Sequence, residues 1–177
     1  GGAKRGYALI LSGPIAFLGT ALLAREAGEA LRAKGVSAEV ITRAKALLFT
    51  PGLSVVGAAR VALEAGGVTA LHDPTEGGLA TGLLELSLAS GVGLEVEESA
   101  IAVLPETREI CAALGLDPMG LIASGALLIA AEPGAAEGIV EALREAGHQA
   151  AIIGRTLDEG EACWLVSGDG QLQELPE

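Results

Sequence analysis

Hydrophobic positions along the chain fall into two patterns. Short runs of Val, Ile, Leu and Ala that end at Gly, Pro or Asp are typical of buried strands, whereas apolar residues three or four positions apart indicate helices. The short runs predict strands at 7–11, 68–71, 93–96, 126–131, 150–153 and 163–166. Helical spacing predicts a helical stretch from residue 15 that Gly35 interrupts, and helices at 38–48, 55–65, 75–89, 105–114 and 133–146.

This order of elements predicts a domain of the α/β (α+β) class, with helices packed on a mixed sheet. The length of 177 residues is in the range of one domain, and no repeat or linker divides the chain. Residues 1–177 are therefore expected to form a single domain. Hydrophobic residues make up 50% of the chain but aromatic residues only 2%, so the core must be aliphatic and rich in small side chains. A turn at 158–160 is expected to join the last two strands.

The first apolar stretch imitates a signal peptide, because Lys4 and Arg5 precede it. The sequence Ser-Gly-Pro at 12–14 interrupts that stretch, which indicates a strand, a tight turn and a helix rather than a membrane span. No association with a membrane is expected. The opening Gly1-Gly2, without an initiator Met, suggests a piece of a longer chain, and a tag remnant and a native linker both remain open.

The charge balance excludes a large class of partners. The chain has 23 acidic and 11 basic residues, a net charge of -12 and no basic run, so it would repel a nucleic-acid backbone. Cys111 and Cys163 lack the spacing and neighbouring histidines of a zinc site or redox pair, which indicates reduced thiols, as in a cytoplasmic protein. Glu95 and Glu97 alternate with apolar residues and face solvent, so no metal site is predicted there.

The segment 72–79 stands where a buried strand ends and a helix begins. Backbone N–H groups at such a helix start are unpaired and can bind an anion. Asp73 is expected to cap the helix, with Pro74 at its first position and Glu76 completing a capping box. This capping needs no ligand.

The adjacent Gly77 and Gly78 are not explained by capping. Each costs about 1 kcal/mol relative to Ala inside a helix, so something must require the missing side chains. Either another stretch of backbone packs closely against them, or a phosphate approaches the helix end. The sequence leaves both explanations open.

The residues at 68–80, continued by 89–93 and 114–118, resemble the C-terminal domain of the aminoimidazole ribonucleotide synthetase (AIR synthase) superfamily. Within it, they look most like the hydrogenase expression/formation family HypE. The resemblance covers essentially the whole chain, and its most specific part is Asp-Pro-Thr-x-Gly-Gly-Leu at 73–79. It implies a fold like the C-terminal domain of PurM, partly ferredoxin-like, and a role in ATP-dependent phosphoryl transfer in a cleft between two domains.

The same resemblance implies partners and cofactors. ATP and Mg²⁺ would be bound mainly by an N-terminal domain that this chain lacks, so no cofactor is expected to bind tightly here and the chain alone is expected to be inactive. The expected partners are that N-terminal domain and, in the full-length protein, a second copy in a homodimer. Hydrogenase maturation in the cytoplasm is the implied setting.

Six residues are expected to face a substrate or a phosphate, and none of them is expected to be catalytic or to bind a metal. They are Asp73, Thr75, Gly77, Gly78, Ser124 and Gly125.

Three interior positions and the C-terminus depart from the family pattern. Glu76 replaces a basic residue, Ser124 replaces the Glu of an Asn-Glu-Gly motif, and Leu18 replaces a His. The resemblance also implies a tail with a reactive cysteine, which is not expected within this chain, whose last residues are Leu-Pro-Glu. Two hypotheses follow: part of an enzyme with a different substrate, or a non-catalytic binding or regulatory module that retains the fold.

Overall fold

The computed structural model describes residues 2–175. Gly1 and residues 176–177, on which the expectations about the two chain ends partly fell, lie outside that range. The strands are β1 (Ala8–Ser12), β2 (Val68–His72), β3 (Val92–Glu97), β4 (Leu127–Ala131), β5 (Ala150–Glu159), β6 (Cys163–Val166) and β7 (Leu172–Glu174). The α-helices are α1 (Phe17–Glu26), α2 (Gly28–Ala33), α3 (Ala38–Ala46), α4 (Val56–Ala65), α5 (Gly78–Ser90), α6 (Pro105–Leu114) and α7 (Ala136–Glu145). Two short 3₁₀ turns are η1 (Glu98–Ala100) and η2 (Pro133–Ala135).

The strands form one mixed sheet in the order β2-β4-β1-β5-β3-β6-β7. All neighbouring strands are antiparallel except β3 and β6, which are parallel. The central strands β1 and β4 are buried along their whole length, as their continuous aliphatic sequences require.

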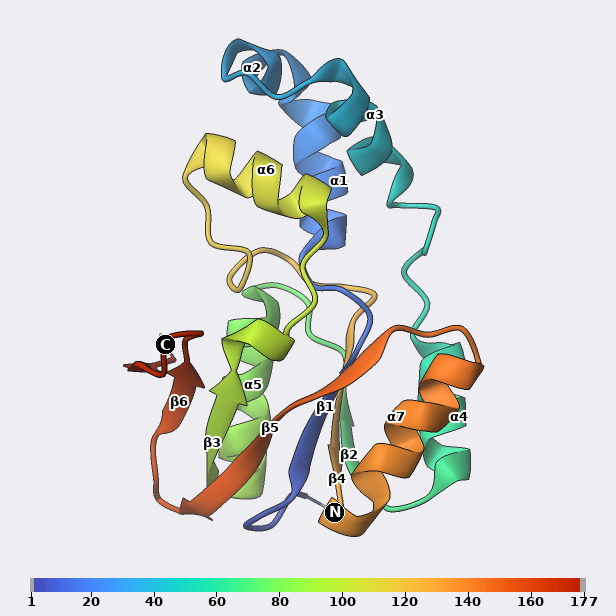
Figure 1. The fold of residues 1–177 in the computed structure, drawn as a ribbon, viewed down its shortest axis with the longest axis vertical. Coiled ribbons are helices and arrows are strands. Elements are labelled where there is room, and N and C mark those ends of the chain that lie inside the picture. The colour runs from blue at the N-terminus through green and yellow to red at the C-terminus, as the bar shows by residue number, and fades with distance from the viewer. Residues whose placement is uncertain (1, 176–177) are drawn as a thin grey trace.

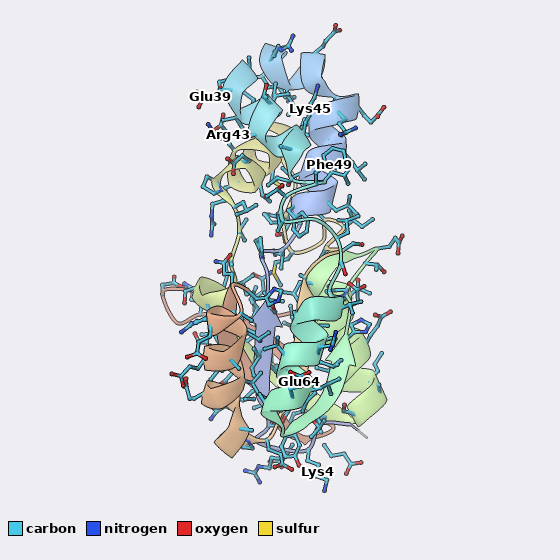
Figure 2. The ribbon with its side chains drawn as sticks, turned by 90° about the vertical axis from the view of Figure 1, so that its right-hand side faces the viewer. Lys4, Glu39, Arg43, Lys45, Phe49 and Glu64 are labelled. Atoms are coloured by element: carbon cyan, nitrogen blue, oxygen red, sulfur yellow. The ribbon has the colours of Figure 1, made fainter. Side chains whose placement is uncertain are left out.

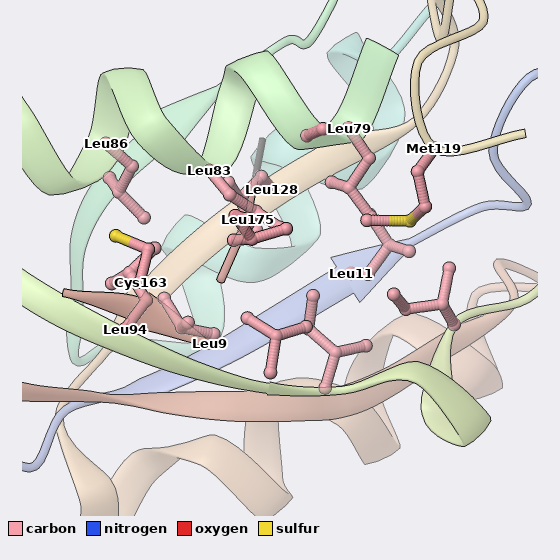
Figure 3. Packing of buried hydrophobic residues seen from close by; sticks show 14 of the residues in the cluster. Leu9, Leu11, Leu79, Leu83, Leu86, Leu94, Met119, Leu128, Cys163 and Leu175 are labelled. Carbon is pink, nitrogen blue, oxygen red and sulfur yellow. The ribbon is translucent and has the colours of Figure 1, made fainter. Parts of the chain in front are cut away.

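Helices cover the two faces of the sheet and divide the core into two layers (Figure 1). On one face, α5 packs Leu79 and Leu83 against Leu9 and Leu11 of β1, as Figure 3 shows. On the other face, α4 and α7 pack against Ile10 and its neighbours. The alternation of side chains along β1 therefore supplies both layers.

Helices α1, α2, α3 and α6 form a separate group at one end of the molecule (Figure 1). They share a small aliphatic core and a buried hydrogen bond of 2.9 Å from Thr20 Oγ1 to Thr107 Oγ1. Arg43 binds Glu39 at 2.6 Å and Glu106 at 2.7 Å, which links α3 to the start of α6. Figure 2 shows Glu39 and Arg43 in this group, at the opposite end of the molecule from Lys4.

The predicted mixed sheet with packed helices is confirmed, and α6 has the predicted bounds. Three details are wrong. The first helical stretch is already broken at Ala27, before Gly35. The turn that ends at Gly160 does not join paired strands, because β3 lies between β5 and β6. Strand β7 was not predicted, since its three residues are exposed and carry little apolar signal.

None of the helices in residues 2–175 is long and apolar enough to cross a membrane.

Candidate functional site

The connection from β2 to α5 carries the most specific sequence motif. Helix α5 begins at Gly78 rather than at Thr75, and its N-cap residue is Gly77, with no side-chain cap. The predicted capping by Asp73 and Glu76 is therefore wrong. The physical reason is that Gly77 and Gly78 adopt left-handed conformations, with φ of 79° and 68°, which postpone the first helical turn.

Close packing of backbone explains Gly78. A Cβ atom at this position would overlap the carbonyl oxygen of Met119 and lie 2.7 Å from that of Leu121. Gly77 has a different neighbour, because a Cβ there would overlap the side chain of Thr81. Of the two explanations left open by the sequence, the first therefore accounts for Gly78 without a phosphate.

The start of α5 is only partly available to an anion. The N–H of Gly78 donates to the carbonyl of Thr75 at 3.1 Å, and the N–H of Ala80 donates to that of Met119 at 3.0 Å. An anion site at a helix start depends on free N–H groups. The loop therefore offers side chains such as that of Thr75 rather than a complete cradle of backbone donors.

The same loop is joined to the segment that precedes β4. The N–H of Ala123 donates to the carbonyl of Thr75 at 3.2 Å, so the two segments with family motifs meet at one edge of the sheet. Asp73, Thr75 and Gly77 are exposed there, and Ser124 is half-buried next to Ala123.

Glu76 places a negative charge on this loop. The pKa of its carboxyl is lowered below the ordinary value, first by its own backbone N–H and second by the Thr75 hydroxyl. The carboxylate is therefore ionised at neutral pH although it caps no helix. It would disfavour a highly charged phosphate group at the same place.

Gly125 lies at a different cavity from the exposed loop residues. A pocket of about 380 Å³ opens beside it, between the end of β1, the connection from α3 to α4, and the connection from α7 to β5. Its polar lining residues are Ser12, Thr50, Ser54, His148 and Gln149. The structure thus divides the six predicted site residues: Asp73, Thr75 and Gly77 are exposed, Gly78 is packed, Ser124 lies between, and Gly125 borders the pocket.

Sequence reasoning missed the position of His148, which it placed in a solvated turn. The residue is half-buried and lines the pocket. A Cβ on Gly57 would lie at an ordinary contact distance of 3.5 Å from Nε2 of His148, so the imidazole packs beside the first turn of α4. The signal in the sequence is faint, because a glycine near a helix start has no distinctive neighbour along the chain.

The remaining candidates have ordinary structural roles. His72 is partly exposed, as expected, and its Nε2 lies 2.8 Å from a carboxylate oxygen of Glu85. Cys111 and Cys163 are buried and unpaired, and burial raises the pKa of the Cys111 thiol. Within residues 2–175, no group of three or more His, Cys, Asp or Glu side chains is placed to hold a metal ion.

Comparison with known proteins extends the likeness beyond the motif. Residues 4–163 match the family described as AIR synthase related protein, C-terminal domain. The chain is 36% identical to carbamoyl dehydratase HypE of Cupriavidus necator over 163 residues, which cover 90% of this chain and 42% of that protein. It is 35% identical to carbamoyl dehydratase HypE of Azotobacter vinelandii over 154 residues, which cover 86% of this chain and 42% of that protein.

Solved structures agree with these relatives. The crystal structure of E. coli HypE has a TM-score of 0.80 and 30% identity, and the match covers 98% of this chain and 51% of that one. A structure of HypE in complex with ATP has a TM-score of 0.74 and 29% identity, again over 98% of this chain and 51% of that one. The predicted fold and the likeness to HypE are confirmed. The chain spans about half the length of these proteins.

Proposed function

Because this chain belongs to the family of AIR synthase related C-terminal domains, we propose that it is the C-terminal domain of an ATP-dependent, HypE-like protein of hydrogenase maturation. It contributes one wall of a cleft between two domains. When bound, ATP supplies the phosphoryl group and Mg²⁺ neutralises its charge. Most of the residues that bind ATP and Mg²⁺ belong to an N-terminal domain. The full-length protein is a cytoplasmic homodimer.

One observation carries the proposal. The Asp-Pro-Thr-x-Gly-Gly loop is hydrogen-bonded through Thr75 to the segment at 119–125, so two family motifs that are distant in sequence share one edge of the sheet. The residues of this chain that face the cleft are Asp73 and Thr75, while Gly78 leaves room for the close approach of loop 119–121. Their role is to position a substrate group, because positioning and charge stabilisation account for most of phosphoryl-transfer catalysis.

Exposed apolar side chains near the connection from α3 to α4 support a partner domain. Phe49 is 73% exposed and Leu53 39% in the connection from α3 to α4, and Val56, the first residue of α4, is 63% exposed; Arg25 lies over the Phe49 ring at 5.5 Å. A cluster of exposed apolar side chains is typical of a contact surface. The N-terminal domain of the full-length protein is the occupant that we propose for it.

The experiment replaces Thr75 with Val in the full-length protein and measures ATP binding and phosphate release. The hydroxyl is lost while the shape is kept, so turnover should fall about tenfold or more if the hydroxyl contacts a charged group in the cleft. The matched control is Thr42→Val, which removes an exposed hydroxyl from α3 in the helical group. The 177-residue chain alone should show no ATP turnover.

Two results would contradict the proposal. Tight ATP binding by the chain alone would refute the division of labour between the domains. A full-length protein that neither binds nor hydrolyses ATP would refute the hypothesis that this domain is part of an enzyme. The alternative hypothesis, a non-catalytic module that retains the fold, would then be favoured.

A further inference from the structure

The apolar layer under α4 and α7 is open at one end. Ala8 and Ile10 of β1 point into this layer, and strand alternation places Ser12 on the same face. Ser12 is not covered by a helix but borders the pocket together with Ala58 and Leu127, which belong to the same layer. The pocket is therefore the uncovered end of a hydrophobic layer, with a hydroxyl group in its floor.

The Ser12 hydroxyl is in an unusual position for a polar group. Ser12 is only 3% exposed, so this polar side chain lies almost wholly inside the protein. Within residues 2–175, no completely enclosed side-chain polar atom lacks a partner, and Ser12 borders the pocket. A polar group of a molecule in the pocket would therefore be within reach of this hydroxyl.

The lining of the pocket carries no permanent charge. It includes no Asp, Glu, Lys or Arg side chain, although the chain as a whole has a net charge of -12. Beside Ser12, the polar groups are hydroxyls, the Gln149 amide and the His148 imidazole, and most other lining residues are aliphatic, proline or glycine. A charged ligand would lose its hydration here without gaining an opposite charge, so an uncharged ligand is favoured.

Close contacts between backbone segments form the walls of the pocket. A Cβ on Gly125 would overlap the Phe17 ring and lie 3.2 Å from the carbonyl oxygen of Gly52. The N–H of Gly13 donates to the carbonyl of Gln149 at 2.7 Å. Loops from four parts of the chain thus meet at the pocket with close backbone contacts, and its volume of about 380 Å³ is in the range of small-molecule sites.

From these observations we infer that the pocket above Ser12 binds a small uncharged molecule with an apolar body and a hydroxyl or carbonyl group that pairs with the Ser12 hydroxyl. Its place in catalysis rests on the proposed function: the pocket holds the part of the substrate that is not a phosphate, while Thr75 faces the phosphoryl group. Binding itself needs no nucleotide.

The test uses three probes of similar shape and different charge: benzyl alcohol, benzylammonium and benzoate. Each is titrated into the ¹⁵N-labelled 177-residue chain, and the backbone amide shifts of Gly13, Gly125 and Gln149 are followed. Benzyl alcohol should shift these amides in a saturable manner and bind about tenfold more tightly than either ion, because the ions must be desolvated without a counter-charge.

Ser12→Ala should weaken benzyl alcohol about fivefold, the effect of one lost hydrogen bond. The control is Ser99→Ala, which removes an exposed hydroxyl from η1 outside this pocket and should leave the affinity unchanged. Thr50→Val at the rim is a second pocket variant, and it tests the same surface if Ser12→Ala folds poorly.

The inference is overturned if benzyl alcohol leaves the three amides unshifted, if either ion binds as tightly, or if both pocket variants bind it like the unaltered chain. The titration contains no ATP, so its failure is distinct from failure of the phosphate-release assay. A full-length protein without ATP turnover would refute the proposed function and leave the binding result standing.

Discussion

Replacement of Gly78 by Ala tests the packing at the start of α5. The substitution adds a Cβ where the Met119 carbonyl oxygen already lies, and where the Leu121 carbonyl oxygen would be 2.7 Å away. Both neighbours are backbone atoms, so neither can turn aside as a flexible side chain would.

The magnitude follows from three contributions. A left-handed conformation costs a residue with a Cβ about 1–2 kcal/mol, and Gly78 has φ of 68°. Overpacking costs about 1–3 kcal/mol, while the reduced entropy of the unfolded chain returns about 0.4–1 kcal/mol. Gly78→Ala should therefore lower the free energy of unfolding by about 1–5 kcal/mol, which is a large part of the stability of a small domain.

The matched control is Gly138→Ala in α7. Gly138 is exposed, and a Cβ there would meet no atom within 4 Å. Since Ala is the better helix former, this variant should raise the free energy of unfolding by about 1 kcal/mol.

Urea denaturation followed by far-UV circular dichroism measures both changes as shifts of the midpoint at an unchanged slope. If Gly78→Ala is as stable as the unaltered chain, the close backbone approach is absent. The presence of glycine at position 78 would then need another explanation, and the approach of a phosphate to the start of α5 would again be the hypothesis to test.

Three further changes test other parts of the structure. Thr20→Val should lower the free energy of unfolding by about 1–3 kcal/mol, because it leaves the buried Thr107 hydroxyl without its 2.9 Å partner. The double variant with Thr107→Val should recover part of this loss in the same urea experiment. The pKa of Glu106 is lowered, chiefly by its hydrogen bond to Arg43, so its stabilisation is present above the ordinary pKa of the carboxyl and is lost as the pH falls through the lowered value. Arg43→Met should therefore lower the urea midpoint at neutral pH, and this effect should shrink as Glu106 is protonated; a loss of equal size in acid would contradict the ion pair. Burial raises the pKa of the Cys111 thiol, so iodoacetamide at pH 8 should leave it unmodified in the folded chain and alkylate it in urea. Mass spectrometry of the digested chain measures both results. Rapid alkylation without urea would argue against the buried position of this thiol.

Most of the elements were predictable because their signals are local. Helix α6 begins at Pro105 and ends before Gly115, residues that suit those two positions by their own backbone preferences. The strands β1 and β4 followed from continuous aliphatic runs. The Asp-Pro-Thr-x-Gly-Gly motif likewise indicated the family from a few adjacent residues.

The start of α5 was not predictable from capping rules. Asp73 and Glu76 have the right spacing for a capping box, but Gly78 packs against the backbone of loop 119–125, which is distant in sequence. The candidate site shows the same limit. Thr75 could be selected from the motif, whereas His148 could not, because only the fold brings it beside Gly57.

By itself, the sequence determined the kinds of element, their order, the aliphatic core and the family. These properties depend on side-chain periodicity and on motifs of a few neighbouring residues. The tertiary structure decided the insertion of β3 between β5 and β6, the delayed start of α5 and the pocket above Ser12. Each of these depends on contacts between segments far apart in the chain, whose geometry no local pattern encodes.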